Sequence, residues 1–161
     1  MHDPDLDRRL QPLRLVVAAM AVGIVTLAVV ASVLAAGGSV SLKPELAGPL
    51  GLALGVFVVV AAVAYTLVRN RMIAGLRQIY EEQSTPDDTA TELAPRYAAI
   101  TIIGAALAEG PSLLGGIVVM LTGQWTALVV PGVGLVVLAL LLPTRDRFAS
   151  FVTQATGRIW P

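Results

Sequence analysis

Four long apolar runs constrain the fold of this chain more than any other feature. They cover residues 15–36, 47–68, 97–121 and 126–142. Each is close to the roughly 20 residues that an α-helix needs to cross the hydrocarbon core of a bilayer. A helix also satisfies its own backbone hydrogen bonds, which lipid cannot do. We therefore expect an all-α, polytopic membrane protein with a four-helix transmembrane domain in residues 15–143.

Composition supports the same class of protein. Of the 161 residues, 56% are hydrophobic and only 14% are charged, whereas about 25% are charged in a typical soluble domain. The first run follows basic residues, as a secretory signal peptide would. It is longer than the roughly 7 to 15 apolar residues of a signal core, so we expect it to be retained as a helix.

The positive charges predict the orientation. The two connections after the first and third runs contain only Lys43, whereas the other non-apolar segments hold arginines, namely Arg8, Arg9, Arg14, Arg69, Arg71, Arg77, Arg96, Arg145, Arg147 and Arg158. Cytoplasmic loops retain Lys and Arg. We therefore expect a cytoplasmic N-terminal tail (1–14), a cytoplasmic loop (69–96) and a cytoplasmic C-terminal segment (144–161).

Two of the flanking segments have a helical pattern of their own. Val68, Met72, Leu76, Ile79 and Tyr80 keep helical spacing, so the second helix is expected to continue into the cytosol and end near the turn-rich stretch 84–88. One helical face after the fourth run holds Phe148, Phe151, Val152, Ala155 and Ile159. This face predicts a helix that lies on the inner membrane surface, with a disordered tail as the alternative.

A single charged residue, Glu109, lies inside an apolar run, about half-way along the third. An acidic residue near the bilayer centre is costly, normally faces the bundle interior and often marks an ion or proton pathway. Small residues share its helical stripe, namely Ala98, Ala105, Ser112 and Gly116, and bulky ones lie opposite, namely Ile103, Leu107, Leu114, Val118 and Leu121. We expect Glu109 to face the other helices and the bulky side to face lipid.

No Lys, Arg or His lies in the four runs, so the neutral, protonated form of Glu109 is favoured. Ser112 and Thr26 supply hydroxyls, and Pro111 leaves the carbonyl of Leu107 without its helical donor. Pro131 is expected to weaken the middle of the fourth helix at a similar depth, so Pro111 and Pro131 are predicted kinks. The predicted proton- or cation-binding site is Glu109, Ser112 and Thr26. The alternative is a permanently protonated, structural Glu109.

Glycines suggest where helices pack. Gly51 and Gly55 form a GxxxG pair, and Gly116 lies on the Glu109 stripe. The stretch around them has no Lys-Ser/Thr ending, so it is not a phosphate-binding loop. A second hypothesis is therefore a non-catalytic packing or assembly protein, which forms a homo-oligomer or binds a membrane partner through the small-residue faces of the second and third helices.

Other classes of function have little support. There are no cysteines and one histidine, His2, in the polar N-terminus. No metal cluster, nucleophile triad or phosphate motif is present in the sequence, so we expect no enzyme, metal or cofactor. The expected partner is the lipid bilayer rather than nucleic acid.

One local pattern resembles a known family. Ala106-Leu107-Ala108-Glu109, followed by Leu113-Leu114-Gly115, resembles the carboxylate helix of the proteolipid c subunit of rotary ATP synthases. The resemblance implies that Glu109 is an ion-binding carboxylate, and Gly48, Gly51 and Gly55 give a thin version of that family's glycine-rich helix. The long 69–96 loop and one added span on either side depart from it.

A longer pattern points elsewhere. With Gly110-Pro111 and Leu121-Thr122-Gly123 included, the chain resembles a group of small uncharacterised bacterial membrane proteins with four helices. That resemblance covers much of the chain and implies no known activity. It implies a location in the bacterial cytoplasmic membrane.

Overall fold

The computed structural model describes residues 4–38, 43–82 and 89–157, and every regular element in this part of the chain is helical. The elements are α1 (Pro4–Ala36), the 3-10 turn η1 (Pro44–Leu46), α2 (Ala47–Glu82), α3 (Thr89–Thr122), the 3-10 turn η2 (Trp125–Leu128), α4 (Val129–Leu141) and α5 (Arg145–Thr156). The expected all-α class is confirmed for the described residues.

Three helices are long and apolar enough to cross a membrane. They are the segments Leu10–Ala36, Pro44–Gln78 and Glu92–Thr122. The fourth run is shorter as a helix, because η2 and α4 cover Trp125–Leu141, roughly 25 Å at 1.5 Å per residue. This segment qualifies only together with α5, to which it is joined through a bend of 75°. The described residues therefore hold three membrane-length helices, or up to four if the bent pair is one span.

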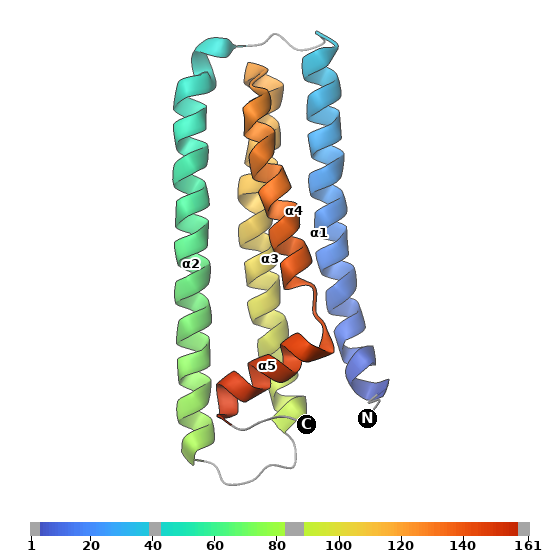
Figure 1. Ribbon diagram of the computed structural model, residues 1–161, viewed down its shortest axis with the longest axis vertical. Coiled ribbons are helices and arrows are strands. Elements are labelled where there is room, and N and C mark those ends of the chain that lie inside the picture. The colour runs from blue at the N-terminus through green and yellow to red at the C-terminus, as the bar shows by residue number, and fades with distance from the viewer. Residues whose placement is uncertain (1–3, 39–42, 83–88, 158–161) are drawn as a thin grey trace.

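The helices run up and down, so that their ends gather at two ends of the molecule (Figure 1). The end of α1, the start of α2 and the α3–α4 turn lie at one end, which we name the turn end. The start of α1, the end of α2, the start of α3 and α5 lie at the other, the α5 end. This arrangement gathers the arginine-bearing segments at the α5 end, the grouping that the charge pattern predicts.

The turn end is closed by backbone hydrogen bonds. Gly123 ends α3 with a positive φ of 70°, a conformation that glycine adopts without steric cost, and its N–H donates to Val119 O at 2.8 Å. Lys43 N donates to Leu121 O at 2.8 Å. The start of α2 is thus tied directly to the end of α3.

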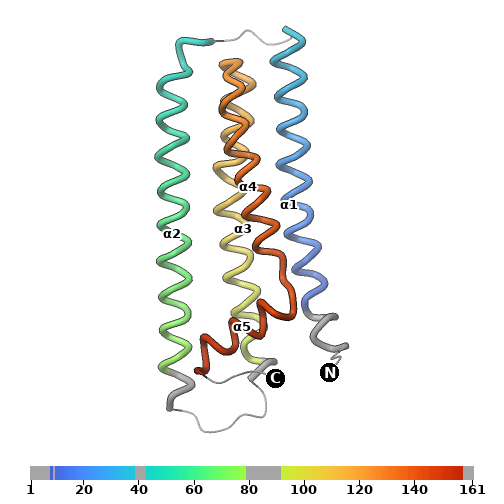
Figure 2. Tube along the Cα trace, in the orientation of Figure 1, coloured from blue at the N-terminus to red at the C-terminus, as the bar shows by residue number. Residues whose placement is uncertain are grey.

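α3 is the central helix, and it packs against α1, α2 and α4 (Figures 1 and 2). The sequence predicted that the side of α3 opposite Glu109 would face lipid, and at Val118 this is wrong. Val118 is fully buried and clusters with Leu54 of α2. Because α3 has neighbours on three sides, its bulky residues fill the interior as well as meet the exterior.

The apolar face of α5 also packs against other helices. Phe148, Phe151, Val152 and Ala155 of α5 are all buried against the ends of α1, α2 and α3. Tyr97 of α3 meets Phe148 edge-on, with ring centroids 5.4 Å apart, and lies 5.3 Å from Phe151. The apolar face of α5 therefore packs on the other helices, and its predicted position on the inner membrane surface stays a prediction. We name this group the α5 cluster. Ile159 lies outside the described residues.

The α5 cluster depends on helices that extend past their apolar runs. α1 begins at Pro4, so most of the segment expected to be a tail is helical, with Leu10 and Leu13 buried. α2 continues to Glu82, which confirms the predicted extension, and its Leu76 is buried in the cluster. His2, the stretch 84–88 and Arg158 lie outside the described residues.

Candidate functional site

Glu109 lies half-buried on the side of α3 that packs against α1. Its Oε1 is 3.7 Å from the position that a Cβ on Gly23 of α1 would take. About two turns further along α3, a Cβ on Gly116 would lie 3.1 Å from Leu27 Cγ of α1. We name these four residues the α1–α3 seam. Glycine on each helix lets the two backbones approach, and the carboxyl occupies the space beside Gly23.

Ser112, one predicted ligand of the site, is turned to a different neighbour. Its hydroxyl donates to Ala108 O at 2.7 Å, four residues back in the same helix. A Cβ on Gly134 of α4 would lie only 1.8 Å from Ser112 Oγ. The Ser112 side chain is therefore enclosed between α3 and α4, and its proton is already donated to the backbone.

Thr26, the other predicted ligand, is exposed. It lies two residues from the buried Ile24, roughly 200° around the helix, and so on the outer side of α1. Of the three predicted site residues, the structure places only Glu109 in the seam. Helical spacing fixed the depth of the two hydroxyls, whereas the rotation of each helix depended on the packing of the whole bundle.

The α1–α3 seam contains few other groups that could interact with the Glu109 carboxyl. In the described part of the chain, Glu109 has no hydrogen bond and no ion pair within the seam or elsewhere. Those residues also hold no group of three or more His, Cys, Asp or Glu side chains that could bind a metal ion. A single carboxyl with no converging oxygen ligands can take up a proton, which needs only one ligand atom.

The two predicted kinks have different positions. α3 runs unbroken through the buried Pro111. Pro131 is the third residue of α4, in its first turn, where the missing N–H has no helical partner to lose. The expectation that Pro131 weakens the middle of the fourth helix is therefore wrong. Pro131 instead packs on α3, since its Cδ lies 2.8 Å from where a Cβ on Gly115 would be.

The predicted packing glycines also separate. Gly116 packs in the seam, as expected for a small residue at a helix contact. Gly51 and Gly55 of α2 are exposed, and a Cβ on either would meet nothing within 4 Å. Within the part of the chain that the structure describes, therefore, the GxxxG pair packs against nothing.

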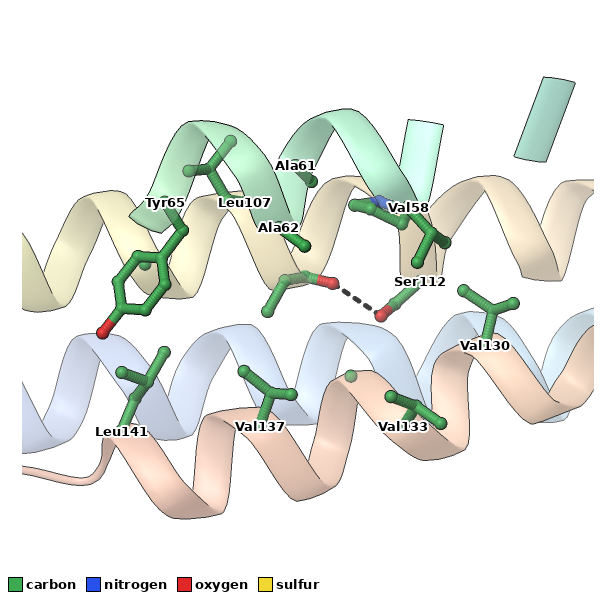
Figure 3. A pocket seen from close by; sticks show the side chains of 14 residues that line it. Val58, Ala61, Ala62, Tyr65, Leu107, Ser112, Val130, Val133, Val137 and Leu141 are labelled. Carbon is green, nitrogen blue, oxygen red and sulfur yellow. Dashed lines mark hydrogen bonds between the residues drawn. The ribbon is translucent and has the colours of Figure 1, made fainter. Parts of the chain in front are cut away.

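A lateral groove between α2 and α4 was not predicted from the sequence. It has a volume of about 350 Å³, its floor is α3, and its lining is almost wholly apolar (Figure 3). Val58, Ala61 and Ala62 of α2 form one wall, and Val130, Val133 and Val137 of α4 form the other. Val133 is 55% exposed, so the groove opens to the exterior. Its one sequence signal is the set of small residues, Gly104, Ala108 and Gly134, that lie along it.

Comparison with protein-family models, with curated proteins and with solved structures found no match. The residue roles proposed below therefore rest on the geometry of this chain, and the resemblance of the Glu109 helix to the c subunit stays a prediction.

Proposed function

We propose that this chain is an integral membrane protein, with four spans and both ends in the cytoplasm, that reversibly binds a proton at Glu109. The observation that carries the proposal is a lone carboxyl, half-buried near the middle of a membrane-length helix against Gly23 of α1. Ionisable groups at that depth are expensive to insert and usually serve proton or ion movement.

The choice of a proton over a metal cation follows from the ligands. Hard cations take several oxygen ligands at once, about six or more for Ca²⁺ and Mg²⁺. In the described residues Ser112 donates to Ala108 O and Thr26 is exposed, so neither joins Glu109. A protonated carboxyl is neutral and suits hydrocarbon, whereas its ionised form would need water or a counter-charge. Proton exchange is thus the chemistry that this seam supports best.

Carbodiimide labelling tests the proposal, because these reagents modify protonated carboxyls in apolar surroundings. We expect Glu109 to be labelled in bilayers and labelling to fall as the pH is raised. Glu109→Gln should abolish it, while the exposed Glu45 near the turn end provides a solvent-facing comparison. Protection by sodium at constant pH would show a cation site instead. Absence of labelling at Glu109 at every pH would refute reversible protonation.

The orientation has its own test, made simple because the chain has no cysteine. Single cysteines at Gln124, in the α3–α4 turn, and at Ser150, in α5, both replace exposed residues. A membrane-impermeant thiol reagent should reach Q124C from outside intact cells and S150C only after the membrane is opened. Labelling of both from the same side would contradict a membrane-spanning α4.

A second candidate function is assembly, favoured by the unoccupied α2 glycines. Gly51 and Gly55 face the exterior, and a Cβ on either would meet nothing within 4 Å. Such a face of small residues allows another helix to pack closely against it. In this case Glu109 would be a structural, permanently protonated residue. Gly55→Leu should then shift the native size in mild detergent from oligomer to monomer, while Glu109→Gln changes only stability. A strictly monomeric wild-type protein would exclude assembly of copies.

A further inference from the structure

A second cavity continues the lateral groove toward the α5 end. It has a volume of about 400 Å³ and is lined by residues of α2, α3, α4 and α5. Tyr65, Val137 and Leu141 line both cavities. Figure 3 shows Tyr65 at the Leu141 end of the groove, with its hydroxyl pointing away from Ser112 and out of the apolar part. The two cavities therefore adjoin along the side of the bundle, and we name them together the channel.

The two parts of this channel differ in chemistry. The groove beside α3 is nearly free of polar atoms, whereas the second cavity is lined by Arg69 of α2 and by Arg147, Ser150 and Gln154 of α5. Arg69 Nη2 donates to Gln154 Oε1 at 3.3 Å, which holds the guanidinium across the α2–α5 gap. In the described residues neither arginine has an ion pair with a carboxylate. Two cations thus face one cavity without a described anion.

The groove is about as long as the acyl chain of a phospholipid. The α4 wall runs from Val130 to Leu141, roughly 16 Å at 1.5 Å per residue. Half of the hydrocarbon core measures about 15 Å. The arginines lie beyond this apolar length, at the level where α5 turns away by 75°. An acyl chain laid along the groove would therefore bring its headgroup to the arginines.

We propose that this channel binds one anionic glycerophospholipid of the surrounding membrane. An acyl chain lies between α2 and α4, and the phosphate sits between Arg69 and Arg147. Guanidinium groups suit this task, since their paired N–H donors match phosphate oxygens. The inference rests on the membrane placement proposed above, but it involves neither Glu109 nor the α1–α3 seam.

Native mass spectrometry of the full chain tests this site. The protein is released from bilayers that contain equal amounts of phosphatidylglycerol and phosphatidylcholine with the same acyl chains. We expect one retained phospholipid, enriched in phosphatidylglycerol. Arg69→Gln and Arg147→Gln should each lower the ratio of the two bound lipids about fivefold, the effect of one basic residue near an anionic headgroup. Arg71→Gln, at an exposed position of α2 outside both cavities, should leave the ratio unchanged.

A second pair of variants tests the acyl groove. Ala62→Leu puts a larger side chain into the groove and should reduce retention of both lipids, whereas Ala53→Leu, exposed on α2 outside the groove, should not. An unchanged lipid ratio in the double arginine variant would overturn the proposal. Loss of the preference for phosphatidylglycerol on addition of inorganic phosphate alone would also overturn it. So would a lipid-free dimer that Ala62→Leu converts to monomers. In all these outcomes the pH-dependent labelling of Glu109 would be unaffected, so the two proposals fail independently.

Discussion

α1 and α2 are similarly long and apolar, but they flank α3 in different ways. α1 closes on α3 near mid-span, where Gly23 receives the carboxyl of Glu109 and Gly116 receives Leu27. α2 turns Gly51 and Gly55 outward and stands across a groove from α4. Beyond α3, its main contact is with α5 at one end of the molecule. Close packing therefore depends on whether the glycines of a helix face a neighbouring helix. Apolar character alone does not produce it.

The largest expected effect concerns the α5 cluster, in which the end of α2 packs against α5. Phe148 is fully buried in the α5 cluster, edge-on to Tyr97. Phe148→Ala should lower the free energy of unfolding by about 3–5 kcal/mol, the usual cost of removing a buried aromatic ring. Thermal unfolding in mild detergent measures this, with the exposed Ser150→Ala as control. Equal unfolding temperatures for the two variants would mean that α2 is not anchored by α5.

The next effect concerns the wall of the groove. A Cβ on Gly134 would lie 1.8 Å from Ser112 Oγ and 3.2 Å from Ala108 O, so Gly134→Ala forces the Ser112 side chain or α4 to move. Overpacking of this kind typically costs about 1–3 kcal/mol. Gly132→Ala, two residues away with nothing within 4 Å, is the matched control and should be neutral or slightly stabilising. The same unfolding assay would expose an error if both variants were equally stable.

A smaller effect is expected when a glycine at the α1 contact is compared with a glycine on α2. In Gly116→Ala the new methyl would meet Leu27 at 3.1–3.2 Å, so the side chain of Leu27 has to shift by a few tenths of an ångström. We expect a loss of stability below about 1 kcal/mol. Gly55→Ala adds a methyl where nothing lies within 4 Å and should leave the stability of the monomer unchanged or slightly raised. A larger cost at Gly55 than at Gly116 would reverse the comparison and favour assembly through α2.

The smallest effect is expected at Thr26. Because Thr26 is exposed on the outer side of α1, Thr26→Val should change neither stability nor the carbodiimide labelling of Glu109. Gly23→Leu, in contrast, puts a bulky side chain where Glu109 Oε1 lies and should alter the labelling. A shift in labelling with Thr26→Val would place its hydroxyl in the site after all.

Much of the fold followed from the sequence. The apolar runs located all four helices of the bundle, and the spacing from Met72 to Leu76 predicted the extension of α2, because both patterns depend only on local periodicity. The apolar face of α5 was also recognised, but its partner was not. That face packs on Leu93 and Tyr97, residues more than fifty positions earlier, and no local pattern reports such a distance.

The site was predictable in part. Glu109 was predicted because it is the single charged residue in an apolar run. The small residues on its helical stripe predicted which side of α3 packs against another helix. Ser112 and Thr26 were misplaced as ligands, because a hydroxyl in a helix readily bonds its own backbone and because the rotation of each helix depends on the packing of the whole bundle. The groove was not predicted, because it arises from the spacing between α2 and α4, and the small residues along it do not report that spacing.

Infrared spectroscopy of the protein in bilayers tests the central claim most directly, because a protonated carboxyl in an apolar site has its own carbonyl band. We expect a band that is lost reversibly as the pH is raised and is absent in Glu109→Gln. A band assigned to Glu109 that stays constant over the whole pH range in which the protein remains folded would contradict reversible proton binding and leave the carboxyl a structural group.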